Sequence, residues 1–148
     1  MPPRHRRLRA ALVPLALAAA TPAHAACTVD VVPLHFGTVR LDSITWSRGR
    51  VGVSCDVAAT VEVALSPGAG SYAMRAMVGP RGARLHYQIY TDQRTYRVWG
   101  DGSGGSATVT ASVPAGGRIE LTLHGMVPAQ VGVPEGSYSD SLTVTLIF

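Results

Sequence analysis

The stretch RVGVSCDV, residues 50–57, alternates apolar residues with small or polar ones at a period of two. Val51, Val53, Cys55 and Val57 share one face of such a segment, and the residues between them share the other. This alternation is typical of a β-strand that packs one face on a core, whereas an amphipathic helix repeats at about 3.6 residues. The stretch therefore predicts a half-buried strand.

The same alternation recurs along the chain, and no convincing helical stripe is present. Further runs with a period of two occupy residues 60–66, 84–91, 118–125 and 141–148. Glycine and proline mark turns between these runs, at residues 67–68, 79–80, 100–105, 114–117 and 134–136. Short strands separated by such turns predict an all-β fold, an antiparallel sandwich or barrel.

Residues 1–25 have the composition of a secretory signal peptide. A basic start precedes a nearly continuous apolar run at residues 10–20, and Ala23-His24-Ala25 supplies a small-x-small cleavage site. The apolar run is too short to remain in a bilayer as an anchor. We expect cleavage after Ala25, which leaves one exported domain over residues 26–148 with no membrane span.

The predicted mature domain has a net charge close to zero. All 13 basic residues of the chain are arginines, and residues 26–148 hold nine of them against nine acidic residues. The domain therefore lacks the cluster of positive charge that marks a nucleic-acid-binding protein. We expect no nucleic-acid partner.

The chain contains two cysteines, Cys27 and Cys55. An even number of cysteines in an exported chain favours a disulfide over free thiols. Closing a loop of this length stabilises a fold by roughly 3–4 kcal/mol in the chain-entropy description. Two distant cysteines alone supply too few ligands for a metal site. We predict a disulfide from Cys27, at the head of the first strand, to Cys55 on a neighbouring strand.

The segment WGDGSGG, residues 99–105, is similar to the Gly-Asp-Ser-Gly-Gly turn of trypsin-like proteases with one extra glycine. That glycine, Gly102, breaks the spacing, and the domain is too short for the two barrels of such an enzyme. A calcium loop is a weak alternative, because Asp101 is its one carboxylate beside Ser103 and Ser106. A glycine-rich β-turn explains the segment better. We predict no catalytic residue, metal ion or cofactor, and hence a protein that is not an enzyme.

Several motifs together resemble the spore coat protein U family, which includes the subunits of archaic (Csu-type) chaperone–usher pili. Their order along the chain is CTVDVVPLHFG (27–37), VGVSCD (51–56), YAMRAM (72–77), LHYQIYTDQRTYRVWGDGSGG (85–105), LHGMVPAQ (123–130) and PEGSYSDSLTVTLIF (134–148). The chain departs from the family pattern at His124, where a tyrosine is usual. The combination is specific, although no single motif is.

The resemblance implies an immunoglobulin-like antiparallel β-sandwich that lacks its last strand. In chaperone–usher systems the gap leaves an apolar groove beside the C-terminal strand, which a periplasmic chaperone fills first. In the pilus, which an outer-membrane usher assembles, the amino-terminal extension of the next pilin subunit replaces the chaperone by β-augmentation. We place the groove on one face of the closing strand, formed by Leu142, Val144, Leu146 and Phe148. No further strand follows to cover this edge, which needs protection from aggregation.

One departure from stacking pilins concerns the amino terminus. If cleavage follows Ala25, only Ala26 precedes Cys27, so the subunit could accept a donor strand but could not supply one. This favours a terminal, tip or minor subunit of a surface fibre. We expect it to pass through the periplasm and to reach the cell surface, or to be secreted.

Two alternatives remain open. One is an adhesin-type domain that binds a surface through the exposed apolar loop MVPAQVGVPEG (126–136). Its apolar residues Met126, Val127, Val131 and Val133 would then form the binding surface. The other is a secreted, spore-coat-like surface protein that does not polymerise.

Overall fold

The computed structural model describes residues 25–148, and the predicted signal peptide lies outside them except for Ala25. The described part of the chain forms eight strands and one 3-10 turn. The strands are β1 (Cys27–Val32), β2 (Thr45–Cys55), β3 (Ala59–Leu65), β4 (Arg75–Val78), β5 (Arg84–Tyr90), β6 (Val109–Val113), β7 (Gly117–Val127) and β8 (Val144–Ile147), and the turn η1 spans Pro80–Gly82. Within residues 25–148 no helix has the length and apolarity needed to cross a membrane.

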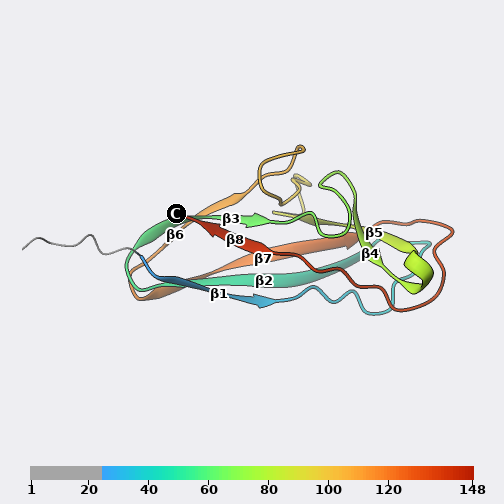
Figure 1. Cartoon of the computed structure of the whole chain (residues 1–148), viewed down its shortest axis with the longest axis horizontal. Helices are drawn as coiled ribbons and strands as arrows, with labels where there is room; N and C mark the ends of the chain where they lie inside the picture. The colour runs from blue at the N-terminus through green and yellow to red at the C-terminus, as the bar shows by residue number, and fades with distance from the viewer. Residues whose placement is uncertain (1–24) are drawn as a thin grey trace, which may run out of the picture.

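The strands form two layers, with β3, β6 and β8 in one layer and β1, β2 and β7 in the other (Figure 1). The larger sheet has the order β1-β2-β7-β5-β4, and the smaller sheet has the order β6-β3-β8. Neighbouring strands pair antiparallel in both sheets. The long strands β2 and β7 pair along their whole length at the centre of the larger sheet. The predicted all-β antiparallel sandwich is confirmed.

The core lies between the two layers and follows from the alternation in the sequence. Val51 and Val53 of β2 and Val61 and Val63 of β3 are all fully buried in one apolar cluster. Burying a side chain of this size contributes about 1.5–3 kcal/mol. The same cluster includes Leu65, Met77, Leu85, Tyr87, Ile89, Trp99, Val113, Leu123 and Val127.

The predicted disulfide between Cys27 and Cys55 is present. The two cysteines lie directly opposite each other, at the start of β1 and the end of β2. Cys55 is buried in the core cluster, and Cys27 packs against it. The bond therefore fastens the first strand to the centre of the larger sheet.

Three strands differ most from the sequence prediction: the closing strand is shorter than predicted, and β4 and β6 were not among the predicted runs. The closing run 141–148 is a strand only at Val144–Ile147, because the preceding Thr143 exchanges hydrogen bonds with Ser66. The backbone N–H of Thr143 donates to Ser66 Oγ at 2.9 Å, and its carbonyl accepts the Ser66 N–H at 2.9 Å. Strand β4 was not predicted, since it is short and begins with the charged residue Arg75.

Candidate strand-binding groove

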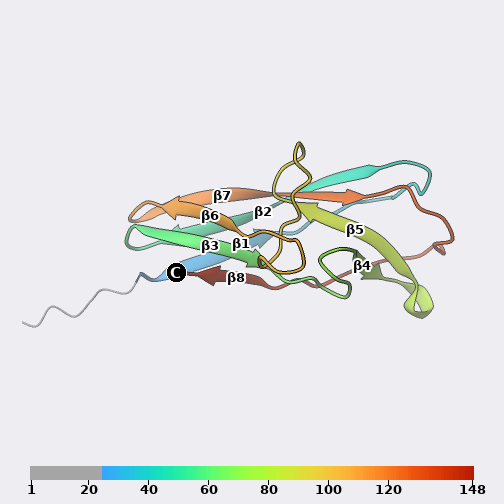
Figure 2. The ribbon, with the colours of Figure 1, turned by 90° about the horizontal axis from the view of Figure 1, so that it is seen from above.

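The strands β1 and β8 are edge strands of opposite sheets, and they lie along the same side of the sandwich. Figure 2 shows both along the same side of the sandwich, running in opposite directions. Among the described residues, β1 pairs only with β2, and β8 pairs only with β3. The outer edge of each strand therefore presents backbone N–H and C=O groups that are free to pair with another strand. We call this side of the sandwich the open flank.

An apolar groove of about 960 Å³ runs into the core at the open flank. Its floor comes from the core faces of β3, β4, β5 and β7, and includes Leu65, Met77, Leu85, Tyr87, Ile89 and Leu123. One wall comes from the end of β1 and the segment after it, including Val31, Leu34, Phe36, Val39 and Leu41. The other wall comes from residues 133–144, including Val133, Tyr138, Leu142 and Val144. The floor residues also belong to the buried core cluster, so the groove is an opening into the core.

The inner face of β1 is incompletely covered. Val29 and Val31 pair across the sheet with Val53 and Val51, so all four side chains point toward the space between the layers. Val51 and Val53 are fully buried, whereas Val29 and Val31 are 38% and 45% exposed. Inward-facing valines with this exposure show that the sandwich does not close over β1.

The structure brings two of the four predicted groove residues into the groove. Leu142 and Val144 line it. Leu146, one position further along the same face, packs against the core cluster instead. Phe148 lies beyond the end of β8 and is 69% exposed. Of the four predicted residues, Leu142 and Val144 therefore line this groove, whereas Leu146 and Phe148 lie outside its lining; a strand-binding role for them stays a prediction.

The sequence prediction missed the wall formed by residues 31–41. Leu34 and Phe36 are half-buried there and pack against the core cluster, yet the part of this segment that follows β1 is not a strand. Its apolar residues alternate in VPLHF, which was a usable signal, but the proline and the lack of a paired run hid it. In an irregular segment that packs on a core, the alternation of apolar and polar residues extends over only a few positions, too few to predict its burial.

The predicted apolar surface loop requires a correction at its first two residues. Met126 and Val127 are the last residues of β7, and Val127 is fully buried. Val127 continues the inward row of β7 from Leu123, so strand periodicity takes it into the core. Val133 lines the groove, and Val131 is 94% exposed. Of the four residues, Val131 alone is strongly exposed.

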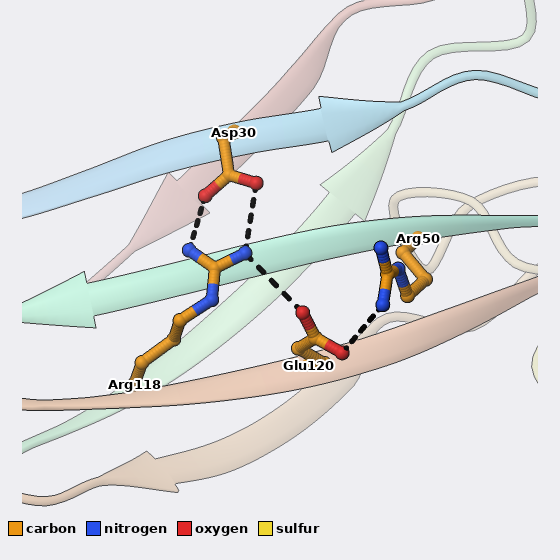
Figure 3. Close-up of polar contacts among 4 residues, drawn as sticks. All are labelled: Asp30, Arg50, Arg118 and Glu120. Atoms are coloured by element: carbon orange, nitrogen blue, oxygen red, sulfur yellow. Dashed lines mark hydrogen bonds and ion pairs between the residues drawn. The ribbon is translucent and has the colours of Figure 1, made fainter.

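Charged side chains hold β1 from its outer face (Figure 3). The Arg118 guanidinium on β7 reaches across β2 to both carboxylate oxygens of Asp30 on β1, with Nη2 at 2.8 Å from Oδ2. It also lies 3.4 Å from Glu120, which pairs with Arg50 at 3.0 Å. The crossing is open because residue 52 of β2 is glycine: a Cβ on Gly52 would lie 2.0 Å from Arg118 Nη2. We call these contacts the outer ladder.

The outer ladder leaves the groove side of β1 untouched. Its hydrogen bonds from Arg118 hold the pKa of Asp30 below its usual range. All four side chains of the outer ladder are exposed, so each ion pair contributes little to stability by itself. Together with the disulfide, the outer ladder fixes β1 from behind while its inner face and free edge remain accessible.

A family model described as the Spore Coat Protein U domain matches residues 14–145. The chain belongs to the Spore Coat Protein U domain family. Protein U of Myxococcus xanthus is 30% identical over 111 residues, a match that covers 70% of this chain and 60% of that protein. This chain therefore spans less than two thirds of the length of its curated relative.

The fold of this family member is similar to a solved pilus-subunit structure. That structure is the CsuC–CsuE chaperone–tip adhesion subunit pre-assembly complex from the archaic chaperone–usher Csu pili of Acinetobacter baumannii. The TM-score is 0.62 at 20% identity, and the match covers 84% of this chain and 40% of that chain. The likeness confirms the predicted immunoglobulin-like sandwich of the chaperone–usher pilin type.

Gln130 and Asp140 connect the segment after β7 to the groove floor. They belong to the motifs LHGMVPAQ (123–130) and PEGSYSDSLTVTLIF (134–148), which the chain shares with the Spore Coat Protein U family. Gln130 acts as a surrogate strand partner for His86: its Oε1 accepts the His86 N–H at 3.0 Å, and its Nε2 donates to the His86 carbonyl at 3.1 Å. Asp140 Oδ2 accepts the Tyr87 hydroxyl at 2.7 Å, and Asp140 Oδ1 accepts the Ala69 N–H at 3.0 Å. Burial and the bond to Asp140 raise the pKa of Tyr87, so its hydroxyl stays a donor. These bonds position the second wall of the groove.

The WGDGSGG segment is a turn that the glycines permit. Gly102, Gly104 and Gly105 all have positive φ, the region that favours glycine. The Ser103 hydroxyl donates to Asp101 Oδ1 at 2.6 Å, and this bond lowers the pKa of Asp101. Within residues 25–148, no group of three His, Cys, Asp or Glu side chains is placed to hold a metal ion.

Proposed function

We propose that this protein is an exported structural subunit of an archaic chaperone–usher pilus, or of a related surface fibre. In this role it accepts an extended strand from another chain in the groove between β1 and β8. The observation that carries the proposal is the exposure of Val29 and Val31 on the inner face of an unpaired edge strand. The proposed role is structural and needs no catalytic step.

The binding chemistry is β-augmentation. A strand laid along the open flank would form backbone hydrogen bonds with the free edge of β1 or β8. Its alternate side chains would enter the groove and cover the floor, and each valine-sized side chain buried there contributes about 1.5–3 kcal/mol. We propose that a periplasmic chaperone supplies this strand first, and that a neighbouring subunit supplies it after delivery to the outer-membrane usher. The protein would then reside in the periplasm only in transit to the cell surface.

The direct test compares two substitutions on neighbouring residues of β8. Val144→Asp puts a charge into the groove, whereas Thr145→Asp puts the same charge on the exposed opposite face. We expect the wild type and Thr145→Asp to co-purify with a co-expressed pilus chaperone, and Val144→Asp to lose it. A stable, soluble monomer without a chaperone, with Val144→Asp no worse than the wild type, would contradict the proposal.

We further propose a terminal or minor position in the fibre, which rests on the predicted cleavage after Ala25. Ala26 is fastened to its own domain: its N–H donates to Asp56 Oδ1 at 2.8 Å, and its carbonyl accepts the Asp56 N–H at 3.1 Å. A mature chain that starts there would have no free segment to donate. Amino-terminal sequencing of the exported protein should give Ala-Cys-Thr. A mature amino terminus well before Ala25 would refute the terminal position and leave strand acceptance intact.

An adhesin-type role is the second candidate, favoured by the exposed apolar residues at one end of the sandwich. Val131 is 94% exposed and Ile44 is 59% exposed. Their two loops are joined by the bond from the Gln130 N–H to the Leu41 carbonyl at 3.0 Å. If this end binds surfaces, the double variant Ile44→Ser, Val131→Ser should lose adsorption to polystyrene while retaining the chaperone. Unchanged adsorption would exclude these loops.

A further inference from the structure

Three aromatic side chains meet on the outer face of the larger sheet, on the side away from the groove. Trp46 comes from β2, Tyr90 from the end of β5, and Tyr96 from the loop that follows β5. Their ring centroids lie 6.2 Å apart for Trp46–Tyr90, 6.1 Å for Trp46–Tyr96 and 5.3 Å for Tyr90–Tyr96. Trp46 is 36% exposed and Tyr96 is 54% exposed. We call these three residues the aromatic platform.

The loop after β5 holds the Tyr96 ring in place at a conformational cost. Tyr96 has a φ of 52°, a left-handed conformation that is unfavourable for a residue with a Cβ. Asp92 fixes the loop, because its Oδ1 accepts the N–H groups of Arg94 and Thr95, each at 2.7 Å. These bonds and the Thr95 hydroxyl lower the pKa of Asp92 to about 2. The loop therefore holds a half-exposed tyrosine in a strained backbone conformation. Strained backbone conformations are common at binding sites.

Three arginines without ion-pair partners among the described residues lie on β2 and in the loop that carries Tyr96. Arg48, Arg94 and Arg97 are exposed, and no carboxylate within residues 25–148 forms a salt bridge with any of them. The Arg48 guanidinium lies 3.4 Å from Gln93 Oε1, which places it beside the same loop. The loop's own acid, Asp92, directs its oxygens to the loop. With Arg48, Arg94 and Arg97 against the single carboxylate of Asp92, the region combines net positive charge with open aromatic rings.

The neighbouring arginines of the same sheet face are compensated. Arg50 lies two residues from Arg48 along β2, and it pairs with Glu120 at 3.0 Å. Arg118 pairs with Asp30 through the outer ladder. Positive charge is therefore left unpaired next to the aromatic platform and paired a few residues further along. This contrast argues for an anionic partner at the aromatic platform.

We propose that the aromatic platform and Arg48, Arg94 and Arg97 bind an acidic polysaccharide. Sugar rings would pack their C–H faces on Trp46 and Tyr96, and the carboxylates of the polymer would pair with the guanidinium groups. The rings are inclined to one another by 46° to 87°, so they offer no parallel stack for consecutive nucleobases. Separate, tilted faces suit the puckered residues of a glycan chain.

The experiment uses polygalacturonate as the acidic probe, dextran as the neutral probe and a single-stranded oligonucleotide as the competing polyanion. Binding is measured by affinity electrophoresis at low and at physiological salt. We expect binding to polygalacturonate that weakens as salt rises, and little binding to dextran. Trp46→Ala with Tyr96→Ala, and separately Arg48→Gln with Arg97→Gln, should each weaken binding by about tenfold or more.

The matched control is Arg50→Gln, which removes the same charge from the same strand and face outside the aromatic platform. It should stay within about twofold of the wild type. Thermal unfolding of every variant checks that the domain is folded, and Val144→Asp in the groove should not change glycan binding. Absence of polygalacturonate binding at low salt, equal binding of dextran, tighter binding of the oligonucleotide, or an equal loss in Arg50→Gln would each overturn the proposal.

Discussion

The two edges of the larger sheet differ in how they are completed. At the open flank, β1 and β8 end their sheets without a partner among the described residues, and Val29 and Val31 remain exposed. At the other end of the strand order of the larger sheet, which we call the closed flank, β4 and the segment around Trp99 complete the core. Arg75 of β4 is fully buried there. The same core is therefore sealed on one side and left accessible on the other.

The closed flank is sealed by side-chain donors that cross between the sheets. Arg75 donates to the carbonyls of Ser66 at 2.9 Å and Trp99 at 2.8 Å, and to Gln88 Oε1 at 2.7 Å. The Trp99 indole donates to the Val63 carbonyl of β3 at 2.9 Å. Burial lowers the pKa of Arg75, but an arginine side chain remains charged at any ordinary pH. These bonds satisfy backbone groups that a neighbouring strand would otherwise satisfy.

The comparison suggests that the two flanks satisfy the hydrogen bonds of their edge backbone groups in different ways. Backbone groups at a sheet edge need partners, and a protein can supply them from its own side chains or leave them for another chain. Here the closed flank uses the first solution, and we propose that the open flank uses the second. The predictions that follow test whether the two flanks respond independently.

The largest expected effect comes from the disulfide at the open flank. Replacing Cys27 and Cys55 with alanine should lower the free energy of unfolding by roughly 3–4 kcal/mol, because the bond closes the loop between β1 and β2. Urea unfolding under oxidising conditions measures the change. Adding a reductant should shift the wild type toward the variant and leave the variant itself unchanged. A loss below about 1 kcal/mol would show that β1 is held mainly by other contacts.

The next effect concerns Arg75 at the closed flank. Arg75→Met keeps an unbranched apolar stem but removes the guanidinium, which leaves the Ser66 and Trp99 carbonyls without their donor. We expect a loss of about 2–3 kcal/mol in the free energy of unfolding, measured by urea titration. The control Arg40→Met, at an exposed arginine, should be close to neutral. If the flanks are independent, folded Arg75→Met should still bind a strand at the open flank, and a matching loss of binding would contradict this.

A smaller effect is expected from the outer ladder. Gly52→Ser places a Cβ in the path of Arg118, whose flexible end must swing away from Asp30. We expect faster hydrogen exchange in β1 with little change in the unfolding midpoint, because the ion pairs are exposed. Asp30→Asn removes the same contact without the steric change and should give the same result. If only Gly52→Ser speeds exchange, backbone distortion rather than the outer ladder is responsible.

Much of the fold could be predicted from the sequence because strand periodicity marks buried faces. The alternation around Val51, Val61 and Ile89 identified core strands, and all three side chains are buried. The even number of cysteines, together with the expectation of export, also predicted the Cys27–Cys55 bond correctly. Strand periodicity is visible within a few consecutive residues, and the two cysteines have only each other as a bonding partner.

The remainder depends on contacts that periodicity does not encode. A buried arginine such as Arg75 has the sequence signature of a surface residue, and only its carbonyl partners explain its position. Leu34 and Phe36 line the groove from an irregular segment. Val127 belongs to the same apolar stretch as Val131, but the end of β7 separates the buried residue from the exposed one. Where a strand ends is set by its neighbours in the sheet.

The most direct test of strand acceptance is hydrogen exchange with and without a synthetic peptide in which valine and threonine alternate. The sandwich has four edge strands among its described residues, β1 and β8 at the open flank and β4 and β6 elsewhere. We predict that the peptide slows exchange in β1 and β8 and leaves β4 and β6 unchanged, and that Val144→Asp abolishes this protection. Equal protection at all four edges, or none at β1 and β8, would contradict a groove built to receive a strand.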